Sequence, residues 1–276
     1  FLVSGQNPRV KTDVAVNWAD AHCHLADPRP GFDPDRAIAS AQQAGIDRFL
    51  QGGIHPEDWK RQLELATRYP TQVFCACGLH PVWVAGASDE EVEQGIEALS
   101  TRLADRRFKA LGELGLDARP AYVGELPKQE RVFRAQLALA KHHATPVILH
   151  VVRAHELALK ILREVGLPAQ GGMVHSFSGG AQEARRYVDL GLHLSVSGGN
   201  FSSGDRRVRE AAAKVPADCW LVETDSPDQK HPDWEGTYSE PARLLDVARR
   251  LGAVLGKKEE AILTESGDRL ARIFAL

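Results

Sequence analysis

Long hydrophobic runs are missing from this 276-residue sequence, although 43% of its residues are hydrophobic. A helix needs about 20 consecutive apolar residues to cross a lipid bilayer, and no segment of the chain offers such a run. A chain of this length can nevertheless bury a large core. The composition therefore predicts a soluble globular protein without a membrane partner.

Cysteine is scarce, with four residues in the chain. Cys23, Cys75, Cys77 and Cys219 lie in apolar, strand-like segments, a pattern typical of small buried side chains rather than of a disulfide framework. No second cysteine pair accompanies Cys75 and Cys77, so we interpret them as core residues and not as a metal site. Their use predicts a reducing compartment, the cytoplasm.

A signal for export is also missing. Residues 1–13 contain neither an initiating methionine nor the basic stretch and apolar block of a signal peptide. We interpret this segment as a lead-in or tag remnant that precedes the fold, and we expect no export.

The chain also lacks an excess of positive charge. The formal net charge is −3 at pH 7, and the arginine pairs are spread along predicted helices. A protein that grips a long duplex presents a concentrated basic surface, so the sequence argues against this class. Nothing in the chain points to an obligate protein partner.

Strand-like apolar runs alternate with amphipathic, helix-like runs along the chain, which is typical of a parallel sheet. The predicted strands end near residues 24, 52, 78, 113, 150, 175, 197 and 225, and helices are expected over 34–45, 57–69, 89–104, 128–143, 154–165, 181–190, 205–214, 240–251 and 259–274. About eight such units fit a (β/α)8 TIM barrel, which usually takes about 250 residues. We therefore predict one barrel domain over residues 14–276. A doubly wound open sheet is the alternative, but the first strand lacks the glycine-rich phosphate-binding turn of that fold.

Two histidines one residue apart, His22 and His24, follow the first apolar run. In a strand, residues i and i+2 share a face, so both imidazoles can reach one metal ion. Other metal-capable residues end later strands. They are Glu113, His150, His175 and Asp225. In a barrel these strand ends converge on one mouth, and grouped ionisable residues are costly to bury without a balancing cation. Together they predict a metal site.

Six ordered sequence blocks resemble the TatD-type metal-dependent hydrolases of the amidohydrolase superfamily. The blocks are Asp20-Ala21-His22-Cys23-His24-Leu25, Gly78-Leu79-His80-Pro81, Gly112-Glu113-Leu114-Gly115-Leu116-Asp117, Pro146-Val147-Ile148-Leu149-His150, Val174-His175-Ser176-Phe177-Ser178-Gly179 and Glu223-Thr224-Asp225-Ser226-Pro227. They run through nearly the whole chain.

The resemblance implies a centre with two divalent ions. One ion would be held by His22, His24 and Asp225, the other by His150 and His175, and Glu113 would bridge them. Catalysis would rest on Glu113 and on Asp225, which would accept a proton from the attacking water. Zn²⁺, Mn²⁺, Co²⁺ and Fe²⁺ suit this mixture of imidazoles and carboxylates, and Mg²⁺ suits it less well.

Three further residues are expected to contact substrate. His80 faces the same mouth and resembles a position that the family uses near substrate, Arg153 offers a fork of donors for a phosphate, and Ser176 lies in a Ser/Gly loop suited to an anion. Aromatic residues in the mouth loops offer stacking surfaces for a base. They are Trp83, Phe177, Phe201 and Trp234.

The resemblance implies a 3′–5′ deoxyribonuclease that trims single-stranded DNA or frayed 3′ ends. The chain departs from the family pattern at Ala118-Arg119-Pro120, at Val151, at Glu265-Ser266-Gly267-Asp268, and at Tyr238-Ser239-Glu240-Pro241, where the family commonly carries an arginine. None of these changes touches an expected ligand, so they bear on substrate and not on hydrolysis. The alternative is hydrolysis of a carboxyl ester, amide or lactone, in a small molecule or an aminoacyl-tRNA.

Overall fold

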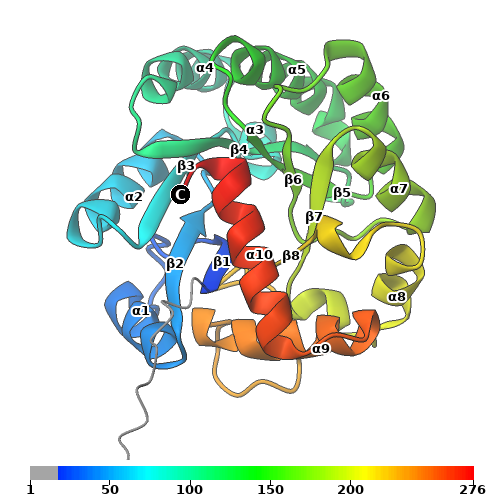
Figure 1. The fold of residues 1–276 in the computed structure, drawn as a ribbon. Coiled ribbons are helices and arrows are strands. Elements are labelled where there is room, and N and C mark those ends of the chain that lie inside the picture. Colours follow the sequence, from blue (N-terminus) through cyan, green and yellow to red (C-terminus); the bar gives the residue numbers. More distant parts are fainter. Residues whose placement is uncertain (1–17) are drawn as a thin grey trace, which may run out of the picture.

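Eight parallel strands, paired in sequence order, form a nearly closed barrel in the computed structural model, which describes residues 18–276 (Figure 1). The predicted (β/α)8 TIM barrel is thereby confirmed. Helices surround the sheet, and in Figure 1 the final helix lies across one end of the barrel. The expected lead-in over residues 1–13 and the first residues of the expected domain lie outside the described residues.

The bounds of the elements follow the chain. The strands are β1 (Trp18–Cys23), β2 (Ile46–Gln51), β3 (Val73–Cys77), β4 (Phe108–Asp117), β5 (Val147–Val152), β6 (Gly172–Val174), β7 (Leu192–Val196) and β8 (Trp220–Val222). The helices are α1 (Pro34–Gln43), α2 (Pro56–Arg68), α3 (Pro81–Gly86), α4 (Asp89–Leu103), α5 (Leu126–His142), α6 (His155–Val165), α7 (Ala181–Asp189), α8 (Arg206–Ala212), α9 (Leu244–Leu255) and α10 (Glu259–Phe274). No helix within residues 18–276 combines the length and apolar content that a bilayer crossing requires.

Several boundaries differ from the sequence-based expectation. Strand β4 continues four residues beyond Glu113 to Asp117, and the short helix α3 is an addition to the expected helices. The helix expected from residue 240 begins instead as a 3-10 turn over Pro241–Arg243, and α9 starts at Leu244. Proline fits the first turn of a helix because its missing N–H has no partner there.

Local sequence signals explain why several helices begin where they do. Asp33 precedes α1, and its carboxylate accepts from the backbone N–H groups of Asp35 and Arg36. Ser88 precedes α4, where Ser88 and Glu91 accept from each other's backbone N–H groups. Such caps satisfy donors that the first turn of a helix leaves unpaired. They fix where these helices start on the outside of the sheet.

The barrel is joined at its seam by the segments that follow β1 and β8. Asp225 donates its N–H to the carbonyl of His22 at 2.9 Å, and His24 donates to the carbonyl of Ser226 at 2.6 Å. These bonds hold the two strand ends together where the strands themselves do not form a regular ladder. The first and last strands therefore meet at the carboxyl end of the barrel.

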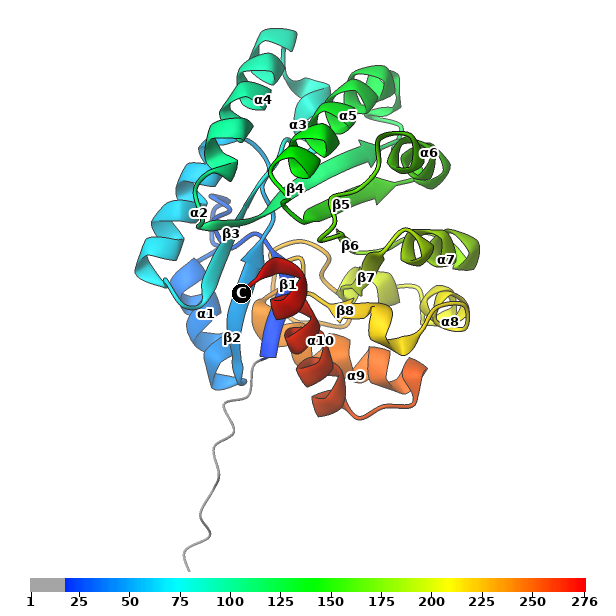
Figure 2. The same ribbon diagram turned by 45° about the horizontal axis from the view of Figure 1, so that its top comes forward.

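Helix α10 closes the opposite end of the barrel. Leu270 and Phe274 pack against a buried interior cluster. That cluster contains Ala19, Ala21, Leu50, Ala76, Ala110, Ile148, Met173 and Leu221. Ser266 accepts from the N–H of Val222 at 3.0 Å, and Figure 2 shows the helix beside β1 and β8. A second, larger cluster fills the space between the strands and the outer helices.

Candidate metal centre

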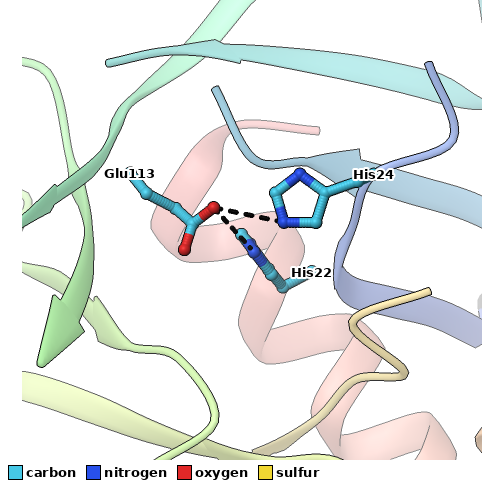
Figure 3. Close-up of side chains that lie close together, drawn as sticks. All are labelled: His22, His24 and Glu113. Carbon is cyan, nitrogen blue, oxygen red and sulfur yellow. Dashed lines mark ion pairs between the residues drawn. The ribbon is translucent and has the colours of Figure 1, made fainter. Parts of the chain in front are cut away.

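Glu113 lies at the centre of a group of buried side chains at the carboxyl end of the barrel. Its Oε1 atom is 3.5 Å from Nε2 of His22 and 3.2 Å from Nε2 of His24 (Figure 3). Its Oε2 atom is 2.6 Å from Nε2 of His175 and 3.3 Å from Nδ1 of His150. The two oxygens of one carboxylate thus face two different pairs of histidines.

Asp225 faces the first of these pairs. Its Oδ1 atom is 3.5 Å from Nε2 of His22 and 3.3 Å from Nε2 of His24. Asp225 has a left-handed backbone with φ of 52°, a conformation in which Asp is one of the more frequent non-glycine residues. The N–H bond to the carbonyl of His22 holds this turn in place. All six expected ligands therefore converge.

The expected ligands do not all lie at the same place relative to the ends of their strands. Glu113 and His150 lie within strands β4 and β5, whereas His24, His175 and Asp225 follow the last residues of their strands. The register between β1 and β2 shifts between Asp20 and Cys23. The shared face of His22 and His24 thus depends on an irregular strand end as well as on their spacing.

Glycine makes room for the histidine pair. A Cβ atom on Gly52 would lie 2.3 Å from Cε1 of His22 and 2.8 Å from Cε1 of His24. Gly78 similarly approaches the backbone of Glu113, because a Cβ there would lie 2.6 Å from its carbonyl oxygen. A larger residue at Gly52 would displace the histidine side chains, and one at Gly78 would displace the backbone of Glu113.

The donor atoms of the cluster fit a divalent metal. His22, His24, Glu113, His175 and Asp225 each have at least one buried nitrogen or oxygen without a hydrogen-bond partner within residues 18–276. Unpaired buried polar atoms are costly, and a cation would satisfy several of them at once. Three groups have ligand atoms within 4.8 Å of one another: His22, His24 and Glu113; His22, His175 and Asp225; and His80, Glu113 and His150.

Burial and charge oppose each other in setting the protonation of the cluster. Burial raises the pKa of Glu113, but electrostatic interaction with the facing histidines, His175 first, brings it well below its usual value. Burial lowers the pKa of His24 and His175, yet the facing carboxylates raise both well above the usual value. Without a cation, the cluster therefore holds protons on imidazoles to balance its carboxylates.

Two carboxylates outside the expected ligand set orient the histidines. Asp117 Oδ2 lies 3.2 Å from Nε2 of His150, and Glu223 Oε1 lies 3.5 Å from Nδ1 of His175. Such partners fix the ring orientation of a metal-binding imidazole. Sequence reasoning missed these roles, although both residues stand in the same sequence blocks as Glu113 and Asp225.

The expected substrate contacts have different surroundings. His80 Nε2 lies 3.2 Å from Nδ1 of His150, and burial, followed by the charge of His150, lowers the pKa of His80 to about 3. Ser176 lines the mouth, but its N–H donates to Glu223 at 2.8 Å and its hydroxyl lies 3.0 Å from that of Ser197. Both residues therefore lie beside the cluster, with part of their hydrogen-bonding capacity already used.

Arg153 is not brought to the cluster. It has a left-handed backbone with φ of 55° directly after β5, is exposed, and lines a separate pocket with His155 and Glu156. Arg119 lies nearer the centre, because it lines both cavities beside the cluster. The sequence did not distinguish these two arginines, since each follows a strand end.

Two cavities open beside the cluster. The smaller, of about 310 Å³, lies against His150, His175 and Asp225. The larger, of about 650 Å³, also contacts His24, Glu113 and the half-buried Trp83. Among the other expected aromatics, Phe177, Phe201 and Trp234 are buried. Trp83 is therefore the expected aromatic that offers a surface in the larger cavity.

The barrel and the convergent imidazoles and carboxylates define the class of the protein as a metal-dependent hydrolase. The family model described as TatD related DNase matches residues 19–275. The chain belongs to this family.

Known proteins agree with this assignment. The chain is 36% identical over 88% of its length to the "Uncharacterized metal-dependent hydrolase YjjV" of Escherichia coli K12, 90% of which is covered. It is 30% identical over 89% of its length to the "3'-5' ssDNA/RNA exonuclease TatD" of Rahnella sp., 94% of which is covered. The crystal structure of YjjV from Escherichia coli matches with a TM-score of 0.84 at 30% identity, covering 95% of this chain and 99% of that one.

Proposed function

We propose that this protein is a 3′–5′ deoxyribonuclease that acts on single-stranded DNA or frayed 3′ ends. The observation that carries the proposal is the position of Glu113, whose two oxygens face two separate sets of histidines. The similarity to the Rahnella protein, whose name specifies a single-stranded nucleic acid substrate, supports the choice of substrate. Water would add its oxygen to phosphorus, the P–O3′ bond would break, and O3′ would leave with a proton.

The chain offers ligands for two divalent ions. His22, His24 and Asp225 would hold one, His150 and His175 the other, and Glu113 would contact both. Zn²⁺, Mn²⁺, Co²⁺, Fe²⁺ and Mg²⁺ are the candidate ions. When bound, such ions lower the pKa of a coordinated water and stabilise negative charge on phosphoryl oxygens.

Asp225 is the residue that we assign to proton transfer. Its Oδ1 atom has no hydrogen-bond partner among the described residues. Burial raises its pKa, but contact with His24 and the charges of His175 and His22 give a net decrease. An ionised carboxylate in this position is suited to accept a proton from the attacking water.

Substrate contacts would come from the walls of the two cavities. His80, Ser176 and Arg119 lie on these walls, and Trp83 offers a ring on which a base can stack. Because the net charge is −3, binding would depend on local positive charge over a few nucleotides. Arg153 remains a weaker prediction because of its separate position.

The loop after β8 bears on the alternative, a carboxyl ester, amide or lactone substrate. In this loop, Oε1 of Glu240 lies 3.7 Å from Nη2 of Arg36. Ser239 is buried, and its hydroxyl donates to the carbonyl of Thr224. Within the described residues, this loop adds no arginine to the walls of the two cavities. Other cationic side chains line these walls, and their positive charge favours a phosphodiester substrate. They are Arg29, Arg119, Arg207 and Lys230.

The cytoplasm is the compartment that we propose for this activity. All four cysteines are free thiols, and Cys23, Cys75 and Cys77 are buried. Thiols persist in a reducing compartment. Detection of the protein in a soluble cytoplasmic fraction, by antibody, would test this assignment.

The test is hydrolysis of a 5′-labelled single-stranded DNA oligonucleotide by chelator-stripped protein. Mg²⁺, Mn²⁺, Co²⁺, Fe²⁺ or Zn²⁺ is restored separately, and Asp225→Asn serves as the variant. We expect a metal-dependent ladder of products shortened from the 3′ end, absent in the variant. A His142→Gln variant, changed at an exposed helix position, is the control. No cleavage with any ion, in metal-loaded protein, would favour a carboxyl ester or amide substrate.

A further inference from the structure

The two cavities beside the cluster differ in charge. The larger cavity is lined by the carboxylates of Asp27, Asp228, Glu113 and Asp225 as well as by cations. Of the described residues that line the smaller cavity, Asp225 is the only acidic one, whereas Arg119 and Arg207 line it together with serines. The smaller cavity is therefore better suited to an anion.

The arginines of the larger cavity are already paired. Nη2 of Arg29 donates to Oδ2 of Asp27 at 2.7 Å and to Oδ2 of Asp228 at 2.8 Å. Arg119, which lines both cavities, pairs with Asp117 at 2.5 Å. These carboxylates offset much of the positive charge that the arginines bring.

Arg207 lacks such a partner within residues 18–276. Its Nη1 donates to the carbonyl of Ser178 at 3.3 Å, and the side chain is exposed. Its neighbours on the same helix are paired, Arg206 with Glu210 at 2.9 Å and Arg209 with Asp205. Arg207 thus contributes a charge that remains available at the edge of the smaller cavity.

The wall of this cavity is held in place by Asn200. Its Oδ1 atom accepts from the N–H of Ser197 at 2.7 Å, and its Nδ2 donates to the carbonyl of Phe177 at 2.8 Å. The first bond shapes the loop after β7, and the second joins this loop to the loop after β6. The cavity is therefore largely formed before a ligand arrives, which lowers the ordering cost of binding.

We infer that the smaller cavity binds a second phosphate of the substrate strand, next to the phosphodiester that is hydrolysed, and that Arg207 contacts it. The inference rests on the proposed function. In 3′–5′ cleavage, only the retained strand carries a further phosphate, on the 5′ side of the scissile bond. The smaller cavity thus receives the retained strand, and the larger cavity receives the terminal nucleoside.

The test compares two thymidine dinucleotides, one phosphorylated at its 5′ end and the other without a terminal phosphate. Calorimetry on chelator-treated protein measures binding without turnover. We expect the 5′-phosphorylated ligand to bind about tenfold more tightly, on the scale of one charge-assisted hydrogen bond. Arg207→Ala should remove this preference, Arg207→Lys should restore part of it, and Arg206→Ala should retain it.

The outcomes separate this inference from the proposed function. An unchanged preference in Arg207→Ala, or no preference in the wild type, overturns the inference even if the oligonucleotide is hydrolysed. Loss of the preference in Arg207→Ala alone supports the phosphate site even if the oligonucleotide is not hydrolysed. In that second case the cavity serves a phosphorylated substrate of another kind.

Discussion

At the carboxyl end of its strands the barrel holds the six expected ligands, four imidazoles and two carboxylates, whereas nearer the amino end the same strands contribute alanine, leucine, isoleucine and methionine. The polar end contains buried atoms without partners among the described residues. The apolar end is covered by Leu270 and Phe274 of α10. One set of strands thus carries a site that favours ligand binding at one end and a packed core at the other.

The largest expected effect concerns the polar end. Glu113→Ala removes the carboxylate that faces both histidine sets, so we expect turnover to fall by about 10³-fold or more, on the scale of losing a key electrostatic group. Elemental analysis and steady-state kinetics measure the effect, and circular dichroism checks the fold. Wild-type-like rates would contradict the bridging role.

The apolar end should show the reverse pattern. Phe274→Ala leaves a cavity beneath α10, and we expect the free energy of unfolding to fall by about 3–5 kcal/mol. Urea denaturation measures this change. Metal content and turnover per folded molecule should remain unchanged, and a loss of metal at full folding would show that the two ends are coupled.

The pH should separate metal-free from metal-loaded protein. The raised pKa values of His24 and His175 stabilise the metal-free fold below their usual value of 6.5, and this contribution is lost as the pH rises through the raised values. The metal must displace those protons, so its apparent affinity should increase with pH. Melting temperatures of both forms between about pH 6 and pH 9 test the opposite trends.

A smaller effect is expected from Asp117→Asn. The change removes the charge beside His150 while keeping the side-chain shape, and we expect metal affinity to fall by about 10- to 100-fold. Competition with a chromogenic chelator measures affinity. Asp105→Asn, which removes a comparable arginine partner on the surface, is the matched control and should bind metal as the wild type does.

The sequence predicted the barrel and the convergence of His22, His24 and Glu113, because strand rhythm and ligand spacing are local patterns. It did not predict that Asp117 contacts His150, since this pair depends on the register between β4 and β5. It also offered Arg153 as a substrate contact and gave no sign that Arg119 lies nearer the cluster. Which arginine reaches the mouth depends on the backbone turn after each strand, which residue type alone does not specify.

Because β1 and β8 meet at the seam, the barrel can close only after its last strand has been synthesised. His22 and His24 are synthesised long before Asp225 and the helix that closes the barrel. A nascent chain therefore carries two of its six expected metal ligands long before Asp225 joins them. Stable capture of an ion, and closure of the barrel around it, must wait until the segment from Asp225 through α10 has been synthesised.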